Sequence, residues 1–207
     1  MRLPFFTSFI IFVVLTNIFI FRSNKRDQKK EDDFWSKELE ANSTRRKSLD
    51  NLSYIKIPVD KLPFGKLPDN DEVLACEKVV RTLSERKVVN LTGITNTELK
   101  LEYGAPNITE LTTYDQNYTQ LVTSLQKWGK ELYDAGLYED AAKVLEFSVS
   151  TRTDVTATYR LLCDMYTSKL GLSLDASKQK KEALLPVAES LNSLSKGQIV
   201  ELINSAV

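Results

Sequence analysis

The chain has 207 residues, which is enough for one ordinary domain and an appendage. Its 28 basic and 28 acidic side chains cancel unevenly: residues 1–30 carry six basic side chains and one acid, and residues 31–207 carry a net charge of −5. The absence of histidine excludes His-based catalytic triads, imidazole general bases and His-ligated metal sites. Two cysteines are too few for a disulfide framework or a Cys-only zinc site.

An uninterrupted apolar segment begins the chain. Leu3 to Phe21 contains 19 residues without a charge. At about 1.5 Å of rise per residue, a helix of this length nearly spans a hydrocarbon core of about 30 Å. We therefore predict a transmembrane anchor over residues 1–21. A cleaved signal peptide is the alternative, but its apolar region is shorter and ends in small residues, whereas this one ends in Ile18-Phe19-Ile20-Phe21.

Basic side chains follow the anchor, whereas only Arg2 precedes it. By the positive-inside rule, this bias places the rest of the chain in the cytoplasm. We therefore expect a single-pass protein of the cell membrane that contacts the lipid bilayer through residues 3–21 and has a cytoplasmic C-terminal domain. The membrane-flanking basic residues are Arg22, Lys25, Arg26, Lys29 and Lys30.

Five N-x-S/T sequons argue against a cytoplasmic location of the C-terminal domain. In a secreted eukaryotic protein they would indicate glycosylation, whereas in a cytoplasmic or bacterial protein they carry no meaning. Asn and Thr are common in this chain, so chance matches are expected. The sequon asparagines are Asn42, Asn51, Asn90, Asn107 and Asn117.

Two segments connect the anchor to the rest of the chain. Residues 22–53 are densely charged and contain neither Gly nor Pro, which predicts a helical stalk. Residues 54–68, the strap, contain three prolines and one glycine, which exclude a regular helix and favour an extended chain. The strap is too apolar for a free linker, so we expect it to lie against the helical domain. A linear docking segment for another protein is the alternative.

Residues 69–207 show the periodicity of amphipathic helices, so we predict an all-α fold. Apolar side chains recur at three- and four-residue intervals over 71–88, where Asp69 or Asn70 can cap the helix. A short helix over 95–103 follows within an irregular connection. From Tyr114 onward, two apolar stripes separated by a break at 134–136 predict an antiparallel helical hairpin, and a third helix follows. Toward the C-terminus, residues 172–181 read as a loop, Pro186 kinks or starts a helix, and a last helix covers 196–207.

The hairpin resembles a tetratricopeptide repeat (TPR), a helix-turn-helix unit of about 34 residues. Its positions are matched by Leu125, Trp128-Gly129, Leu132, Gly136-x-Tyr138, Ala141, Leu145, Ser148 and Thr153. Small side chains at Gly129 and Ala141 let the two helices approach closely, and Gly136 supplies the positive φ of the tight turn. The best repeat covers 122–155, and a degraded repeat covers 156–192. The resemblance implies an all-α architecture with an N-terminal transmembrane helix and a TPR-like antiparallel helical-hairpin array.

The whole chain also resembles uncharacterised membrane-anchored proteins of clostridial-type bacteria. The likeness lies in the order of the anchor and of short segments such as RRKSLDNL, YGAPNI, YDQNYT and STRTDVTATY. It implies a bacterial cell membrane and no particular function.

In the TPR family, side chains of the first helix of each repeat line a concave groove that binds a partner. Carried over residue by residue, the resemblance implies a groove formed by Gln126, Lys127, Lys130, Tyr133, Arg160 and Asp164. The three basic side chains of this set would accept an acidic peptide or a C-terminal carboxylate. A solvated charged face is the alternative interpretation.

No pattern in the chain favours catalysis, so we predict no catalytic residues, no metal, no cofactor and no small-molecule substrate. The net charge of −5 beyond residue 30 argues against nucleic-acid binding. We expect a membrane-anchored protein–protein interaction scaffold that binds an unidentified protein or peptide through the groove. The alternative is a structural or regulatory subunit of a membrane complex whose anchor packs against a partner, or an extracytoplasmic envelope protein if the topology is reversed.

Overall fold

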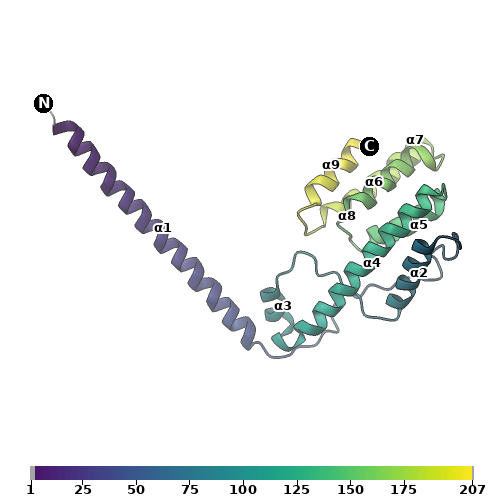
Figure 1. Ribbon diagram of the computed structural model, residues 1–207, viewed down its shortest axis with the longest axis horizontal. Coiled ribbons are helices and arrows are strands. Elements are labelled where there is room, and N and C mark those ends of the chain that lie inside the picture. The colour runs from purple at the N-terminus through teal and green to yellow at the C-terminus, as the bar shows by residue number, and fades with distance from the viewer. Residues whose placement is uncertain (1–2, 207) are drawn as a thin grey trace. The chain divides into compact units, whose positions relative to one another are not determined.

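The computed structural model describes residues 3–206, without the side chains of residues 3–6, 24 and 26. Over these residues the regular structure is entirely helical, which confirms the predicted all-α class (Figure 1). The elements are α1 (Leu3–Ser43), α2 (Asp71–Ser84), α3 (Asn96–Tyr103), a 3-10 turn η1 (Ala105–Asn107), α4 (Ile108–Asp134), α5 (Tyr138–Ser150), α6 (Thr156–Asp164), a π-helical turn η2 (Met165–Lys169), α7 (Leu174–Glu182), α8 (Leu185–Glu189) and α9 (Lys196–Ala206).

The chain divides into two compact units. The N-terminal unit contains the chain up to Ser48 together with Thr95–Ile108, and the C-terminal unit contains Leu49–Ile94 and the chain from Thr109 onward. This division differs from the predicted boundary, because Thr95–Ile108 was expected to belong to the helical domain of residues 69–207. Its helix α3 packs instead on the end of α1.

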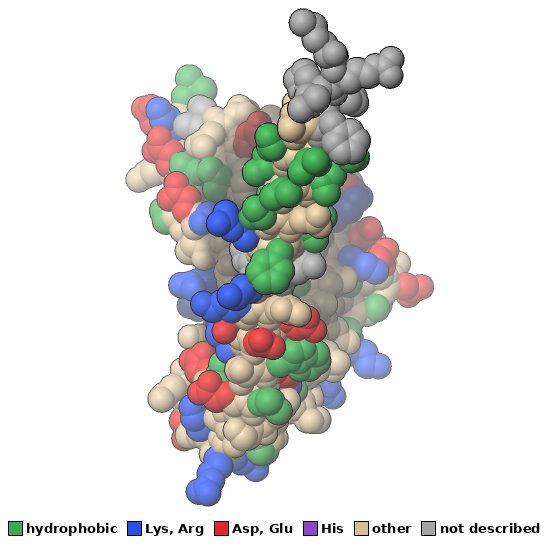
Figure 2. Space-filling view, turned by 90° about the vertical axis from the view of Figure 1, so that its left-hand side faces the viewer, with side chains coloured by type: hydrophobic (Ala, Val, Ile, Leu, Met, Phe, Trp, Pro, Cys, Tyr) green, Lys and Arg blue, Asp and Glu red, His purple; other side chains and the backbone are tan. Residues whose placement is uncertain are grey.

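Helix α1 contains residues 3–21 of the predicted anchor and most of the predicted stalk in one continuous helix. Its apolar part is long enough to cross a membrane by length and composition, and the side chains described there, from Thr7 onward, are exposed. The polar interruptions bond one turn back, because the Thr16 hydroxyl donates to the Phe12 carbonyl at 2.6 Å and the Asn17 amide donates to the Val13 carbonyl at 3.1 Å. Figure 2 shows hydrophobic side chains gathered next to the grey N-terminal residues, with Lys and Arg side chains farther along.

The predicted membrane-flanking basic residues lie on the helical part of the stalk. Arg22, Lys25, Lys29 and Lys30 are exposed on α1, whereas the side chain of Arg26 lies outside the described part of the chain. The helix ends at Ser43, so the last ten residues of the predicted stalk are not helical.

The C-terminal part of α1 is joined to α3 by polar contacts. Thr95 caps α3 in a capping box with Glu98. Glu38 of α1 forms an ion pair with Lys100 and accepts a hydrogen bond of 2.7 Å from the Thr97 hydroxyl. These two contacts, led by the bond from Lys100, lower the pKa of the Glu38 carboxyl below its ordinary value.

Asn107 holds the segment that follows α1. Its side-chain amide donates to the carbonyls of Lys47 and Tyr103 at 2.8 and 2.7 Å, and its carbonyl oxygen accepts from Arg46 at 2.7 Å. Gly104, with φ of +93°, lies so close to this segment that a Cβ atom would be 2.2 Å from the Arg45 carbonyl oxygen. Arg46 and Lys47 are therefore held in a hydrogen-bonded junction, while the side chains of residues 45–47 are exposed.

The C-terminal unit is built around one apolar core. Trp128 and Tyr159 are its largest fully buried side chains. Helices α4 and α5 approach closely at Gly129, where an added Cβ atom would lie 2.4 Å from Cδ2 of Leu145. Gly136 lies within the connection between them and has a φ of +78°. Both glycines therefore play the conformational roles predicted for them.

The strap lies against this core. Ile55, Ile57, Phe64 and Leu67 pack on it, and the rings of Phe64 and Trp128 have centroids 4.9 Å apart. The strap leads directly into α2, whose first backbone N–H groups are capped by the side chain of Asn70, as predicted.

Residues 172–181 were predicted to form a loop, and this prediction is wrong. Helix α7 occupies most of this range despite having no clear apolar stripe. Ser173 caps it, Asp175 lies in its first turn, and basic side chains lie in its last turn, all of which favour a helix. Lys181 is buried and donates hydrogen bonds to the Thr167 hydroxyl and to the Ala206 carbonyl, so it ties α7 to η2 and α9. Pro186 lies in the first turn of α8, in agreement with one of its two predicted roles.

Candidate functional site

A groove of about 540 Å³ lies between α2 and α4. Its α2 wall consists of Glu72, Ala75, Cys76 and Val79. Its α4 wall consists of Gln116, Thr119, Gln120, Thr123, Ser124 and Lys127. Both sets follow the three- and four-residue spacing that places side chains on one helix face. Other side chains of the two helices supply the core, and Cys76 belongs to both.

The two helices run antiparallel along the groove. At one end, the Asn70 amide donates to a Glu131 carboxylate oxygen at 2.8 Å, and Lys127 forms an ion pair with Glu72 at 3.5 Å. At the other end, the Asn117 amide donates to the Lys87 carbonyl at 2.9 Å. Because the α4 wall covers eleven residue steps, the groove is about 16 Å long.

The walls of the groove differ in chemistry. The α2 wall is apolar and small-sided at Ala75, Cys76 and Val79, whereas the α4 wall presents amides and hydroxyls. Gln116 and Gln120 are exposed, and neither side-chain amide bonds to another residue that the structure describes. The groove therefore offers apolar contact on one side and, on the other, exposed amides that a bound segment can hydrogen-bond.

Charge is confined to one end of the groove. The Lys127 and Glu72 side chains are 58% and 54% exposed, and an ion pair at this exposure contributes at most about 1 kcal/mol. A charged group on a partner can therefore replace either member of the pair at little cost.

The two thiols of the chain are apolar groups and not nucleophiles. Cys76 is 6% exposed, and burial raises the pKa of its thiol. Burial also raises the pKa of Cys163 to about 11. Both thiols remain protonated at neutral pH, so Cys76 contributes to the groove as a small hydrophobic side chain.

The six residues predicted to line a groove are divided among three places. Of these, Lys127 lines the groove between α2 and α4. Gln126 accepts a hydrogen bond from Thr158, and the Tyr133 hydroxyl donates to Asp164 at 2.5 Å. The bond to Asp164 is the main cause that raises the pKa of Tyr133 to about 12. These bonds join α4 to α6, so the side chains there satisfy one another.

The two remaining residues of the predicted set are exposed. Lys130 pairs with Asp134 on its own helix. Arg160 forms no hydrogen bond or ion pair within the described residues. The groove between α2 and α4 therefore contains one of the six residues, and the binding role predicted for the α4 and α6 side chains stays a prediction. The i, i+3, i+4, i+7 spacing of Glu72, Ala75, Cys76 and Val79 is the sequence signal for the α2 wall.

Three of the five sequon asparagines use their amide groups within the fold. Asn107 is 1% exposed, Asn117 is 8% exposed, and both donate to backbone carbonyls. Asn90 donates to the Tyr118 hydroxyl at 2.9 Å and to two backbone carbonyls. Because a glycan attaches to this same amide nitrogen, glycosylation at these three sites would break the bonds. Asn42 and Asn51 are exposed.

Nothing in the described residues points to metal chemistry, since no group of three or more His, Cys, Asp or Glu side chains there could hold an ion. Comparison with protein-family models, curated proteins and solved structures found no match for this chain.

Proposed function

We propose that this protein is a membrane-anchored binding module that holds a segment of another protein in the groove between α2 and α4. The observation that carries the proposal is the groove itself, with its apolar wall, its polar wall and its two glutamine amides that bond to no other described residue. Both amides are exposed, so water satisfies them in the free protein. A segment of another chain can take the place of that water when it binds.

The chemistry of the walls favours an extended segment of about five residues, since an extended chain advances about 3.3 Å per residue. An extended segment has free backbone N–H and C=O groups, which Gln116 and Gln120 can bond, whereas the backbone of a helix satisfies its own groups. Its side chains facing α2 would be apolar, to match Ala75 and Val79. A charged residue at one end would compete for Lys127 or Glu72.

A TPR-like array is part of this proposal. The close approach at Gly129, the positive φ of Gly136 and the bonds that join α4 to α6 support it. In such an array α2, which runs antiparallel to α4, takes the place of the second helix of a preceding repeat.

We also propose that the groove faces the cytoplasm. The basic residues that follow the apolar part of α1 support this orientation. A cytoplasm-only fluorescent reporter and, separately, an export-only phosphatase are fused after Val207. Fluorescence without phosphatase activity is expected. The opposite pattern would reverse the orientation and would direct the search for a partner outside the cytoplasm.

The binding proposal is tested by filling the groove. Ala75 is exposed on the α2 wall, so Ala75→Trp adds bulk to the groove without entering the core. Ala157→Trp is the matched control, because Ala157 is also exposed on a helix and does not line the groove. The full chain and both variants are purified from membranes of the native host, and the co-purifying proteins are quantified by mass spectrometry. A partner should be lost from Ala75→Trp and retained by Ala157→Trp, whereas equal recovery from all three proteins would refute the groove as the binding site.

A further inference from the structure

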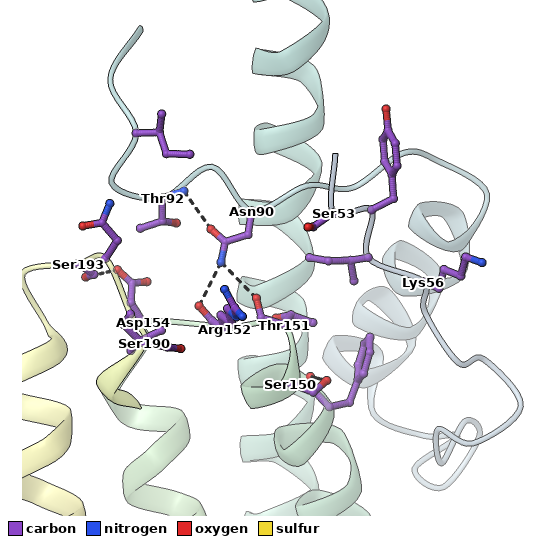
Figure 3. A pocket seen from close by; sticks show the side chains of 16 residues that line it. Ser53, Lys56, Asn90, Thr92, Ser150, Thr151, Arg152, Asp154, Ser190 and Ser193 are labelled. Carbon is purple, nitrogen blue, oxygen red and sulfur yellow. Dashed lines mark hydrogen bonds between the residues drawn. The ribbon is translucent and has the colours of Figure 1, made fainter. Parts of the chain in front are cut away.

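A second cavity, of about 560 Å³, lies in the C-terminal unit where four segments meet (Figure 3). These segments are the start of the strap, the connection after α2, the turn from α5 to α6, and the connection from α8 to α9. They contribute residues 53–56, 90–94, 147–154 and 190–193. The volume is within the range of small-molecule sites.

Hydrogen bonds between the segments fix the walls of this cavity. The Asn90 amide donates to the carbonyls of Thr151 and Arg152 at 3.2 and 3.1 Å, and its oxygen accepts from the Thr92 N–H at 2.9 Å, as Figure 3 shows. The Ser193 hydroxyl donates to Asp154 at 2.6 Å. A ligand would therefore meet a cavity that is already formed, which lowers the entropic cost of binding.

Arg152 is the unusual residue of this cavity. It is the one non-glycine residue with positive φ in the described chain, at +61°. This conformation is unfavourable for a side chain with a Cβ atom, and glycine would adopt it without that cost. Within the described residues its guanidinium has no hydrogen-bond or ion-pair partner, although it lines the cavity. Residues held in such conformations are concentrated at ligand sites.

The other charged groups of the cavity leave Arg152 as its available cation. Asp154 is bonded by Ser193. Lys56 points away from the other labelled side chains in Figure 3. The hydroxyls of Ser150, Thr151 and Ser190 also line the cavity, where each donates to a backbone carbonyl and keeps lone pairs that can accept from a ligand. The guanidinium of Arg152 matches an oxyanion, since its fork of N–H groups bonds two oxygens at once.

We propose that this cavity binds a small organic oxyanion, a carboxylate or a phosphate ester with a hydroxylated body, through the guanidinium of Arg152. This inference is independent of the binding of a partner in the groove between α2 and α4. It also goes beyond the sequence-based expectation, which included no small-molecule ligand.

Malate and inorganic phosphate serve as probes, titrated at constant ionic strength into the full chain in detergent and followed by calorimetry. Arg152→Gly removes the guanidinium and at the same time relieves the backbone, so loss of binding cannot be attributed to misfolding. We expect at least one probe to bind the wild-type chain, and its affinity to fall by about tenfold or more in Arg152→Gly. Arg152→Lys should bind at an intermediate level, and Arg160→Ala, at an exposed arginine outside the cavity, should bind as the wild type does.

Each other outcome would overturn the proposal. Failure of both probes to bind the wild-type chain at millimolar concentration contradicts an oxyanion site, as does equal binding by Arg152→Gly. The malate and phosphate arms distinguish a carboxylate from a phosphate ligand. Ala75→Trp should bind the probe normally, so that failure of the groove and failure of this cavity are separate results.

Discussion

Each of the two units of this chain is stabilised internally by a different kind of interaction. The N-terminal unit depends on polar contacts between segments that are far apart in the sequence, with Asn107 and the Glu38–Lys100 ion pair at its centre. The C-terminal unit depends on an apolar core around Trp128 and Tyr159, with helices in close contact. The first should therefore be sensitive to the loss of single polar groups, and the second to changes of shape. The groove and the oxyanion cavity both belong to the shape-dependent unit.

The largest loss of stability is expected at Gly129, where α5 leaves no room for a side chain on α4. Gly129→Ala places a Cβ atom 2.4 Å from Cδ2 and 2.6 Å from Cγ of Leu145, so this fully buried side chain must shift. We expect a loss of about 2–3 kcal/mol in the free energy of unfolding, larger than the gain of about 1 kcal/mol from helix propensity. Chemical denaturation of the full chain in detergent measures this loss.

Gly197→Ala in α9 is the matched control, because a Cβ atom there has no neighbour within 4 Å. That variant should be as stable as the wild type or more stable, by up to about 1 kcal/mol. In a Leu145→Ala background the penalty of Gly129→Ala should largely disappear. An equal effect of both glycine substitutions would contradict the close approach of α4 and α5.

A smaller and more local effect is expected in the N-terminal unit. Asn107→Ala removes three hydrogen bonds, two to backbone carbonyls and one from the Arg46 side chain, at a cost of about 2 kcal/mol. Hydrogen exchange should show faster exchange at the N–H groups of Lys47 and Ala105, which donate across this junction. Exposed Asn51→Ala is the control. Unchanged exchange rates in Asn107→Ala would show that the junction does not depend on this side chain.

Arg152→Gly should stabilise the protein, in contrast to Gly129→Ala and Asn107→Ala. Glycine adopts the +61° φ of this position without strain, so we expect the free energy of unfolding to rise by about 0.5–1 kcal/mol. Arg152→Ala removes the guanidinium and keeps the strain, so it should show no such gain. If both variants had the same stability, the backbone of this turn would not be strained.

The smallest effect on stability is expected at the charged end of the groove. Lys127→Ala combined with Lys130→Ala removes two exposed ion pairs, which should change the free energy of unfolding by less than about 1 kcal/mol. Partner capture should nevertheless weaken if the partner carries an acidic group. Because Lys127 lines the groove and Lys130 does not, the single variants separate their roles, and a loss caused by Lys130→Ala alone would favour a binding face outside this groove.

Local features of the fold could be predicted from the sequence because they depend on neighbouring residues. The cap at Asn70 and the turn at Gly136 are set by short-range backbone geometry, and the apolar length of α1 is visible in its composition. Helix α7 was missed because its capping signals are weak beside the absence of an apolar stripe. Such a helix forms because tertiary contacts such as those of Lys181 complete it.

The candidate sites were harder to predict because they depend on which distant segments meet. Lys127 was predicted to line a groove, but nothing local to α4 indicates that α2 forms the other wall. The resemblance implied a groove shared by α4 and α6, where Tyr133 and Asp164 bond to each other, and that groove stays a prediction. The cavity around Arg152 is formed by four segments spread over 140 residues, and its positive φ becomes visible only in the folded chain.

The central claim is that the groove between α2 and α4 holds a segment of another protein. The most direct measurement is photo-crosslinking in native membranes, with a photoreactive residue in place of Thr123 in the groove or, as a control, in place of Ala157 outside it. We predict a discrete crosslinked species from position 123 that is absent from position 157 and that disappears when Ala75→Trp fills the groove. The absence of a crosslink at position 123, or the same species from both positions, would contradict the account.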